Sequence, residues 1–268
     1  MSQAKVESLQ GKCALVTGAA RRIGASITEL LHGHGVNVAI HYRGAEPDAI
    51  ELSGRLNEHR PDSARIFRGD LANAGEPASL LDAVLAWSGR LDILINNASS
   101  FYPTPLGTIT EEQWSELIGS NLKAPLFLSQ AAVPHLRSSR GVIVNIIDIH
   151  ATRPLRDHAV YGSAKAGLAM LTRSLAKDLA PDIRVNGVAP GAIAWPENGM
   201  SDAIKEKITG QIPLGRTGDP ADIAKPCFSW YGMRPTRRDK SSQSTAAARL
   251  AGEGIVSQMN IDGRQRMT

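Results

Sequence analysis

Near its N-terminus the chain carries a short apolar segment, a glycine turn and an amphipathic segment, and this order restricts its possible folds more than any other feature. Residues 12–17 have the pattern of a buried strand, Gly18 and Gly24 bracket the turn, and residues 23–34 have the pattern of a helix. A helix N-terminus placed directly after such a turn can receive a pyrophosphate through backbone N–H groups. The sequence therefore predicts a dinucleotide-binding unit, which a further strand at 36–40 extends.

The following 150 or so residues alternate short apolar segments with helix patterns. The apolar segments lack a clean polar alternation, as expected for strands buried on both faces. This predicts an α/β fold with a doubly wound parallel sheet of the Rossmann type. The chain is expected to form a single domain, residues 1-268, because 42% hydrophobic residues are enough for one core. The remaining predicted strands are 64–68, 91–96, 141–147 and 183–188, and the remaining predicted helices are 77–88, 111–137 and 158–180.

Composition excludes several classes of function. The formal charge of +4 arises from 30 basic and 26 acidic residues spread along the chain, so we expect no nucleic-acid partner. Residues 1–11 lack an apolar signal region and no run of 18 apolar residues occurs, so we expect a cytoplasmic protein with no membrane partner. Cys13 and Cys227 have neither metal-site nor disulfide spacing, and we expect no metal and two inert thiols.

A catalytic pair is predicted on the helix at 158–180. Tyr161 and Lys165 are four residues apart and therefore share one helix face. A neighbouring cation favours the phenolate, so we expect the pKa of Tyr161 to lie below its usual value of about 10, which would make the phenol a proton donor near neutral pH. By itself the spacing also fits a surface pair on an amphipathic helix, and the dinucleotide-binding context decides for catalysis.

The cofactor is predicted from the residues that follow the second strand. A site that prefers NAD carries an acidic residue there, about 20 residues after the glycines, to hold the ribose hydroxyls. This chain has His41, Tyr42 and Arg43 instead. Arg43 and Arg22 can pair with a 2′-phosphate, which favours NADPH, although each arginine alone also fits a solvated surface charge.

In doubly wound sheets the ligand lies beyond the carboxyl ends of the strands, and there the motifs of this chain are concentrated. In chain order the motifs are 17–24 with its two glycines, Asn96-Asn97-Ala98, Asn121, Tyr161 with Lys165, Arg184-Val185-Asn186 and Pro190-Gly191. Over residues 10–224 they resemble the short-chain dehydrogenase/reductase family. Three departures are similar to the pteridine reductases within it: Arg21 and Arg22 in the turn, the segment 97–105, and Asp148 where serine is common.

The resemblance implies NADPH-dependent reduction of dihydropterins, and of fully oxidised pterins or folates, to the tetrahydro form. It implies that Tyr161 delivers a proton, that Asn121 relays water to Lys165, and that Phe101 covers the pterin ring. Ser99 and Arg22 would contact the pterin and the cofactor phosphates. Asp70 would hold the adenine, and Asn97 and Lys165 would hold the ribose. The other implied cofactor-binding residues are Gly18, Arg21, Arg22, Ile23, Gly24, His41, Tyr42, Arg43, Leu71, Ala98, Ser99, Pro190 and Gly191.

Asp148 separates pterin chemistry from carbonyl chemistry. A serine donates a hydrogen bond to a carbonyl oxygen, which an ionised carboxylate cannot do. Reduction of a C=N bond needs a proton at nitrogen, and a carboxyl group with a raised pKa, or a carboxylate that steers Tyr161 and a water, suits that task. Alternatively Asp148 caps a turn, and the chain is a general carbonyl or enoyl reductase, or an inactive nucleotide-binding remnant.

The C-terminal residues 226–268 depart from the family pattern of an apolar helix and a final strand. Every residue of 227–231 can be encoded by a codon that begins with T. In a shifted reading frame this T becomes the middle base, and codons with T in the middle encode only the apolar residues Phe, Leu, Ile, Met and Val. We therefore hypothesise that this part is translated out of frame and that the last helix and strand are disrupted; the alternative is a natively divergent basic tail. With an intact C-terminus we expect a homo-oligomer, a dimer or a tetramer.

Overall fold

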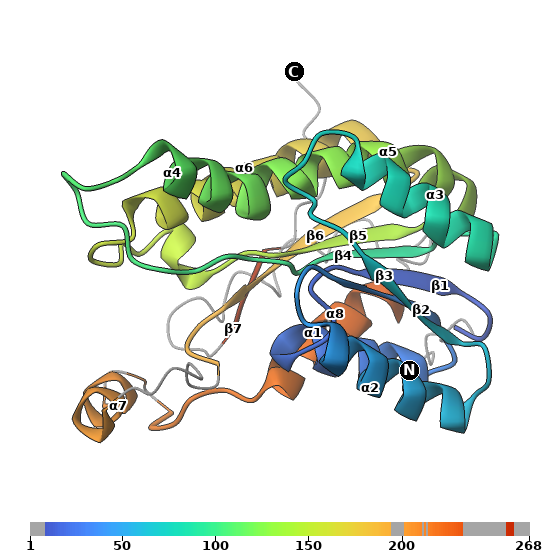
Figure 1. Ribbon diagram of the computed structural model, residues 1–268, viewed down its shortest axis with the longest axis horizontal. Coiled ribbons are helices and arrows are strands. Elements are labelled where there is room, and N and C mark those ends of the chain that lie inside the picture. Colours follow the sequence, from blue (N-terminus) through green and yellow to red (C-terminus); the bar gives the residue numbers. More distant parts are fainter. Residues whose placement is uncertain (1–8, 194–200, 211, 213, 233–255, 260–268) are drawn as a thin grey trace, which may run out of the picture.

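A computed structural model describes residues 9–193, 201–210, 212, 214–232 and 256–259. Their strands form one sheet in the order β3-β2-β1-β4-β5-β6-β7, and β1 to β6 are parallel (Figure 1). The predicted doubly wound sheet is thereby confirmed. The strand bounds are β1 (Cys13–Val16), β2 (Asn37–Tyr42), β3 (Ala64–Arg68), β4 (Ile93–Asn96), β5 (Val142–Ile146), β6 (Arg184–Pro190) and β7 (Val256–Met259).

Helices cover both faces of the sheet (Figure 1). On one face are α1 (Arg22–Gly33), α2 (Glu46–His59) and α8 (Pro220–Gly232), and on the other are α3 (Glu76–Ser88), α4 (Glu111–Ile118), α5 (Ala124–Ser139) and α6 (Ala159–Leu179). A π-helical turn, Gly119–Lys123, divides the helix predicted over 111–137. The sequence patterns did not predict α2 or α7 (Asp202–Thr209), and α7 stands apart from both layers. None of the helices in the described ranges is long and apolar enough to cross a bilayer.

The core explains why the strand sequences are apolar without alternation. On β5, Val142 and Val144 pack into the cluster beneath α1, α2 and α8, while Ile143 between them packs into the cluster beneath α3, α5 and α6. Successive side chains of a strand point to opposite faces, so a strand covered on both faces needs apolar residues at every position. All three side chains are fully buried.

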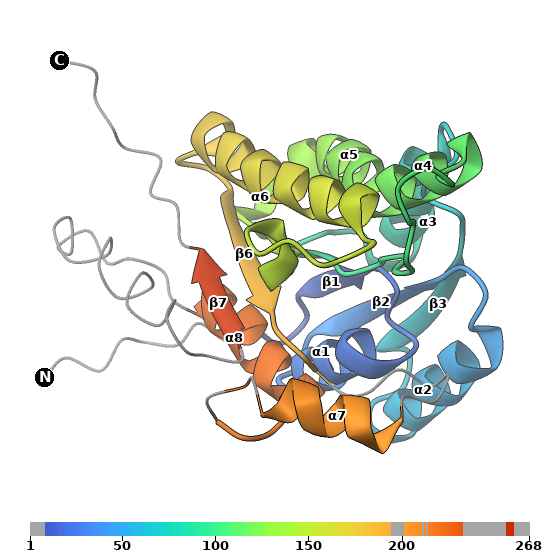
Figure 2. The same cartoon turned by 90° about the vertical axis from the view of Figure 1, so that its left-hand side faces the viewer.

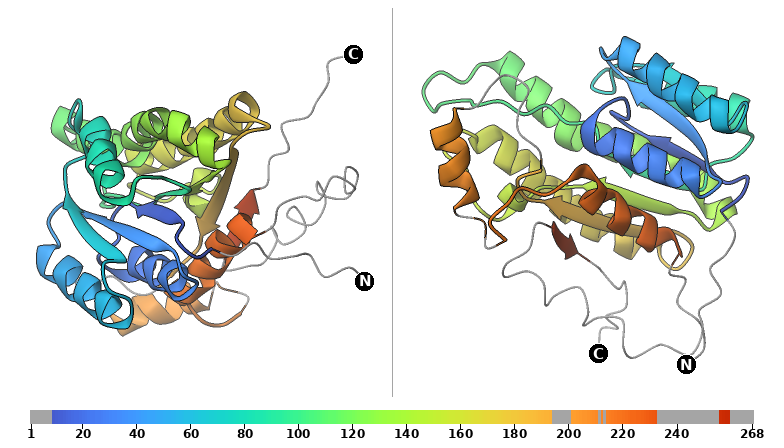
Figure 3. Two further views of the ribbon diagram at one scale, coloured as in Figure 1. Left: turned by 90° about the vertical axis from the view of Figure 1, so that its right-hand side faces the viewer. Right: turned by 90° about the horizontal axis from the view of Figure 1, so that it is seen from below.

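The C-terminal helix requires a correction. We expected it to be disrupted, but α8 forms and lies alongside α1, with Ile223, Ala224 and Cys227 buried in the core (Figure 3). Burial raises the pKa of the Cys227 thiol to about 12 and that of Cys13 to about 11, which disfavours the reactive thiolate. Strand β7 pairs antiparallel with β6 at the sheet edge (Figure 2). Most of the segment for which we hypothesise a shifted frame, 233–255 and 260–268, lies outside the described residues.

Candidate active site

The predicted catalytic pair and Asp148 come together at the carboxyl end of β5. Tyr161 and Lys165 lie on the buried face of α6, with 3% and 2% of their surfaces exposed. The Tyr161 hydroxyl donates to Asp148 Oδ2 over 2.6 Å. The other carboxylate oxygen accepts from the backbone N–H of His150 at 2.8 Å. Asp148 therefore caps a turn and also accepts from the Tyr161 hydroxyl, so the turn cap does not exclude contact with the phenol.

The electrostatics of this centre overturn one expectation. Burial, together with the adjacent Asp148 carboxylate, raises the pKa of Tyr161, whereas we expected Lys165 to lower it. Lys165 donates to the Ile146 carbonyl over 3.0 Å, and its ammonium lies 5.7 Å from the centroid of the Tyr161 ring. Burial lowers the pKa of Lys165 to about 8. Near neutral pH the phenol is thus protonated and the lysine is still largely a cation.

The glycine turn between β1 and α1 is closely packed against the segment after β4. Gly18 has a φ of +60°, and a Cβ atom on it would lie 2.9 Å from the Ala98 Cα. A Cβ atom on Gly24 would lie 2.2 Å from the Gly18 carbonyl oxygen. Asn97 Nδ2 donates to the carbonyls of Thr17 and Gly18 at 2.9 and 3.0 Å, so the Asn97 side chain fixes the start of the turn. A turn with glycines at these two close contacts, leading into the N-terminus of α1, fits a dinucleotide pyrophosphate.

His41, predicted to contact the cofactor, lies beneath this turn. Its Nδ1 accepts from the Gly18 N–H at 3.2 Å, so the ring hydrogen is on Nε2, which lies 3.2 Å from the Gly69 carbonyl. Burial lowers the pKa of His41 to about 4. Tyr42 and Leu71 are also buried, and the Tyr42 hydroxyl donates to Glu46 over 2.9 Å. The structure therefore places these three side chains in the interior, and their contact with a cofactor stays a prediction.

The three arginines predicted at the cofactor site have different partners. Arg21 pairs with Asp48 at 2.7 Å. Arg22 adopts a φ of +51°, a left-handed conformation that costs about 1–2 kcal/mol for a residue with a Cβ atom, and donates to the Ile193 carbonyl over 3.3 Å. Arg43 pairs with Glu116 at 3.3 Å. Arg22 is thus directed toward the end of β6 and Arg43 toward α4.

The segment after β4 forms one wall beside the catalytic centre. Ser99 donates to Asn121 Oδ1 over 2.7 Å, and Asn121, fully buried in the π-helical turn, donates back to the Ser100 carbonyl at 2.9 Å. Phe101 is 53% exposed, meets the Tyr161 ring edge-on and stacks on His158, with both centroid distances 4.8 Å. Asn121 therefore shapes the wall, and Phe101 offers an aromatic surface beside Tyr161.

The other predicted positions lie at strand ends. Asp70 follows β3, and its carboxylate accepts from the Ala72 N–H at 3.2 Å. Pro190 ends β6 and Gly191 follows it, while Ile23 packs against the core. His158 and Glu116 were not among the predicted site residues. His158 stands three residues before Tyr161, a helical spacing that could have indicated it, but no local pattern indicates Glu116.

Comparison with known proteins identifies the family. A family profile described as enoyl-(acyl carrier protein) reductase matches residues 18–229. The chain belongs to the short-chain dehydrogenase/reductase family. This short-chain reductase is 37% identical over 248 residues to pteridine reductase 1 of Leishmania tarentolae, covering 78% of this chain and 86% of that protein. It is 38% identical over 216 residues to the 3-oxoacyl-(acyl-carrier-protein) reductase FabG of Staphylococcus aureus strain Mu50, covering 80% and 87%. The protein is an oxidoreductase of this family.

Proposed function

We propose that this oxidoreductase uses NADPH to reduce pterins, converting a dihydropterin to its tetrahydro form. The observation that carries the proposal is the 2.6 Å hydrogen bond from Tyr161 to Asp148, at a position where a ketone reductase needs a hydroxyl donor. The 37% identity to pteridine reductase 1 supports the same reading.

NADPH, when bound, would supply a hydride for the carbon of the C=N bond, and residues of this chain deliver the proton to nitrogen. The Asp148 carboxylate accepts from the Tyr161 hydroxyl and so holds the phenol beside the substrate, and the phenol hydrogen can turn from this oxygen toward the ring nitrogen. Tyr161 gives its proton to that nitrogen and takes another from solvent. The Lys165 cation, 5.7 Å from the phenol ring, stabilises negative charge that develops on the phenol oxygen. Phe101 would stack on the flat heterocycle.

The residues available for the cofactor fit a phosphorylated ribose. The chain has no acidic residue directly after β2, where NAD-preferring sites carry one, and instead presents Arg43. The glycine turn would hold the pyrophosphate and Asp70 the adenine. Sequence similarity to FabG supports a second candidate, reduction of a 3-oxoacyl thioester, which Asp148 opposes because its carboxylate repels a developing oxyanion.

The deciding experiment measures NADPH oxidation with dihydrobiopterin and with a 3-oxoacyl thioester, for the wild type and for Asp148→Ser. We expect the wild type to reduce the pterin, and the variant to lose at least about tenfold in pterin turnover while gaining weak thioester reduction. Asp182→Asn, an exposed carboxylate change outside the site, is the control. Unchanged pterin turnover in Asp148→Ser, or thioester reduction alone by the wild type, would favour the second candidate.

A further inference from the structure

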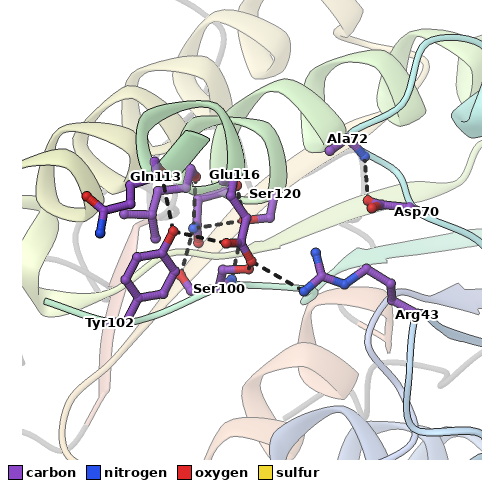
Figure 4. A network of polar contacts seen from close by, with 10 residues as sticks. Arg43, Asp70, Ala72, Ser100, Tyr102, Gln113, Glu116 and Ser120 are labelled. Carbon is purple, nitrogen blue, oxygen red and sulfur yellow. Dashed lines mark hydrogen bonds and ion pairs between the residues drawn. The ribbon is translucent and has the colours of Figure 1, made fainter. Parts of the chain in front are cut away.

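Glu116, on the last turn of α4, joins two loops that follow different strands (Figure 4). Its Oε1 accepts from Arg43, which follows β2, at 3.3 Å and from the Ser100 hydroxyl at 3.0 Å. Its Oε2 accepts from the Tyr102 hydroxyl at 3.0 Å. Ser100 and Tyr102 both belong to the segment after β4. One carboxylate thus contacts the residue proposed for the ribose phosphate and the segment that borders the catalytic centre.

Residues 99–102, which we call the substrate wall, have two sides. Ser99 and Phe101 face the catalytic centre, where they contact Asn121 and Tyr161. Ser100 and Tyr102 alternate with them and donate to Glu116 on the opposite side. Phe101 lies in the chain between Ser100 and Tyr102, so a carboxylate that holds both of these residues also restricts the position of Phe101.

The charge on Glu116 suits both contacts. Burial raises the pKa of this carboxyl group, but hydrogen bonds from Tyr102, Ser100 and Arg43 outweigh burial and bring the pKa below its usual range. The group is therefore an anion at neutral pH. The Arg43 guanidinium has five N–H donors, so it can keep Nη2 on Glu116 while it offers other donors to a phosphate. Glu116 thereby orients Arg43 before any nucleotide binds.

We propose that Glu116 is a positioning residue that couples the ribose end of the cofactor site to the substrate wall. The inference rests on the proposed function, because it takes the 2′-phosphate to lie at Arg43 and the pterin to lie at Phe101. Coupling between two binding sites is reciprocal, so a nucleotide that engages Arg43 orders the wall, and an ordered wall favours that nucleotide.

The test compares the wild type with Glu116→Gln, which keeps the shape and one acceptor but removes the charge. Glu111→Gln, an exposed change at the start of the same helix, is the matched control. The first measurement is the ratio of the dissociation constants for NADH and NADPH, by fluorescence titration. We expect Glu116→Gln to lower this ratio about two- to fivefold, the effect of one partly exposed charge contact. The second is amide hydrogen exchange of residues 98–102, which NADPH should slow more than NADH in the wild type but not in Glu116→Gln.

A lower ratio and the loss of the exchange difference in Glu116→Gln, with neither change in Glu111→Gln, would support the coupling. In Glu116→Gln we also expect kcat with dihydrobiopterin to stay within about twofold of the wild type while the Michaelis constant for the pterin rises. A Glu116→Gln variant that matches the wild type in the ratio or in the exchange would overturn it. A wild type that binds NADH and NADPH equally would refute the proposed cofactor, and this inference with it. Absent pterin turnover with coupled exchange intact would refute the proposed substrate alone.

Discussion

The proposed catalytic centre and the proposed ribose end of the cofactor site differ chiefly in burial. Tyr161 and Lys165 are 3% and 2% exposed, and the bond from Tyr161 to Asp148 is 2.6 Å long. The side chains of Arg43 and Glu116 are 53% and 40% exposed and lie 3.3 Å apart. Charges interact strongly where water is excluded and weakly where water and salt screen them. Buried groups should therefore control the rate of reaction, and the exposed pair should only adjust cofactor choice.

The largest effect is expected from Tyr161→Phe. It removes the hydroxyl that donates to Asp148, so kcat should fall about 10²–10⁴-fold while NADPH affinity stays nearly unchanged. Steady-state turnover and fluorescence titration of NADPH measure the two quantities. Tyr42→Phe, which removes a hydroxyl bonded to Glu46 away from the centre, is the control. Wild-type turnover in Tyr161→Phe on every substrate would remove the distinction between the two regions.

The next effect concerns stability and comes from His41, on the buried side of the comparison. Its folded pKa of about 4 lies below the unfolded value of 6.5, so the unfolded chain binds more protons between these pH values. The free energy of unfolding should therefore fall as the pH is lowered from 6.5 to 4, by about 3 kcal/mol from this group, and level off below that. Above pH 6.5 the group contributes no slope.

Urea unfolding of the wild type and of His41→Gln across this pH range tests that effect. Glutamine can accept from the Gly18 N–H and donate to the Gly69 carbonyl, but it does not titrate. The pH dependence of the variant should be shallower than that of the wild type by the stated amount. Parallel curves would show that His41 is more accessible to protons than its burial implies.

The smallest of the three effects is expected at the exposed arginine. Arg43→Ala should weaken NADPH binding by about 1.5 kcal/mol, the lower end for a charge-assisted contact, because water reaches the guanidinium. NADH binding should be unaffected. Calorimetric titration of both nucleotides measures this, with Arg137→Ala, another exposed paired arginine, as the control. A loss comparable to that of Tyr161→Phe would show that the ribose end is as decisive as the catalytic centre.

Much of the site could be predicted because its signals are local. Apolar runs indicate strands buried on both faces, the turn from Gly18 to Gly24 indicates where a pyrophosphate would lie, and a spacing of four puts Tyr161 and Lys165 on one face. Parallel strands present their carboxyl ends at one edge, so the position of Asp148 directly after a predicted strand also predicted that it lies at the ligand edge of the sheet.

Properties that depend on distant neighbours could not be predicted from local patterns. The direction of the Tyr161 pKa shift follows from burial and from Asp148, which outweigh the hydrogen bond with Ser99. Helix α8 packs against α1 and buries Ile223, Ala224 and Cys227 in the core. Arg43 and Glu116 are 73 residues apart, so no periodicity relates them. A sequence pattern indicates on which face of a helix, or at which end of a strand, a residue lies. The burial of that residue and its pKa depend on which other segments of the chain pack against it.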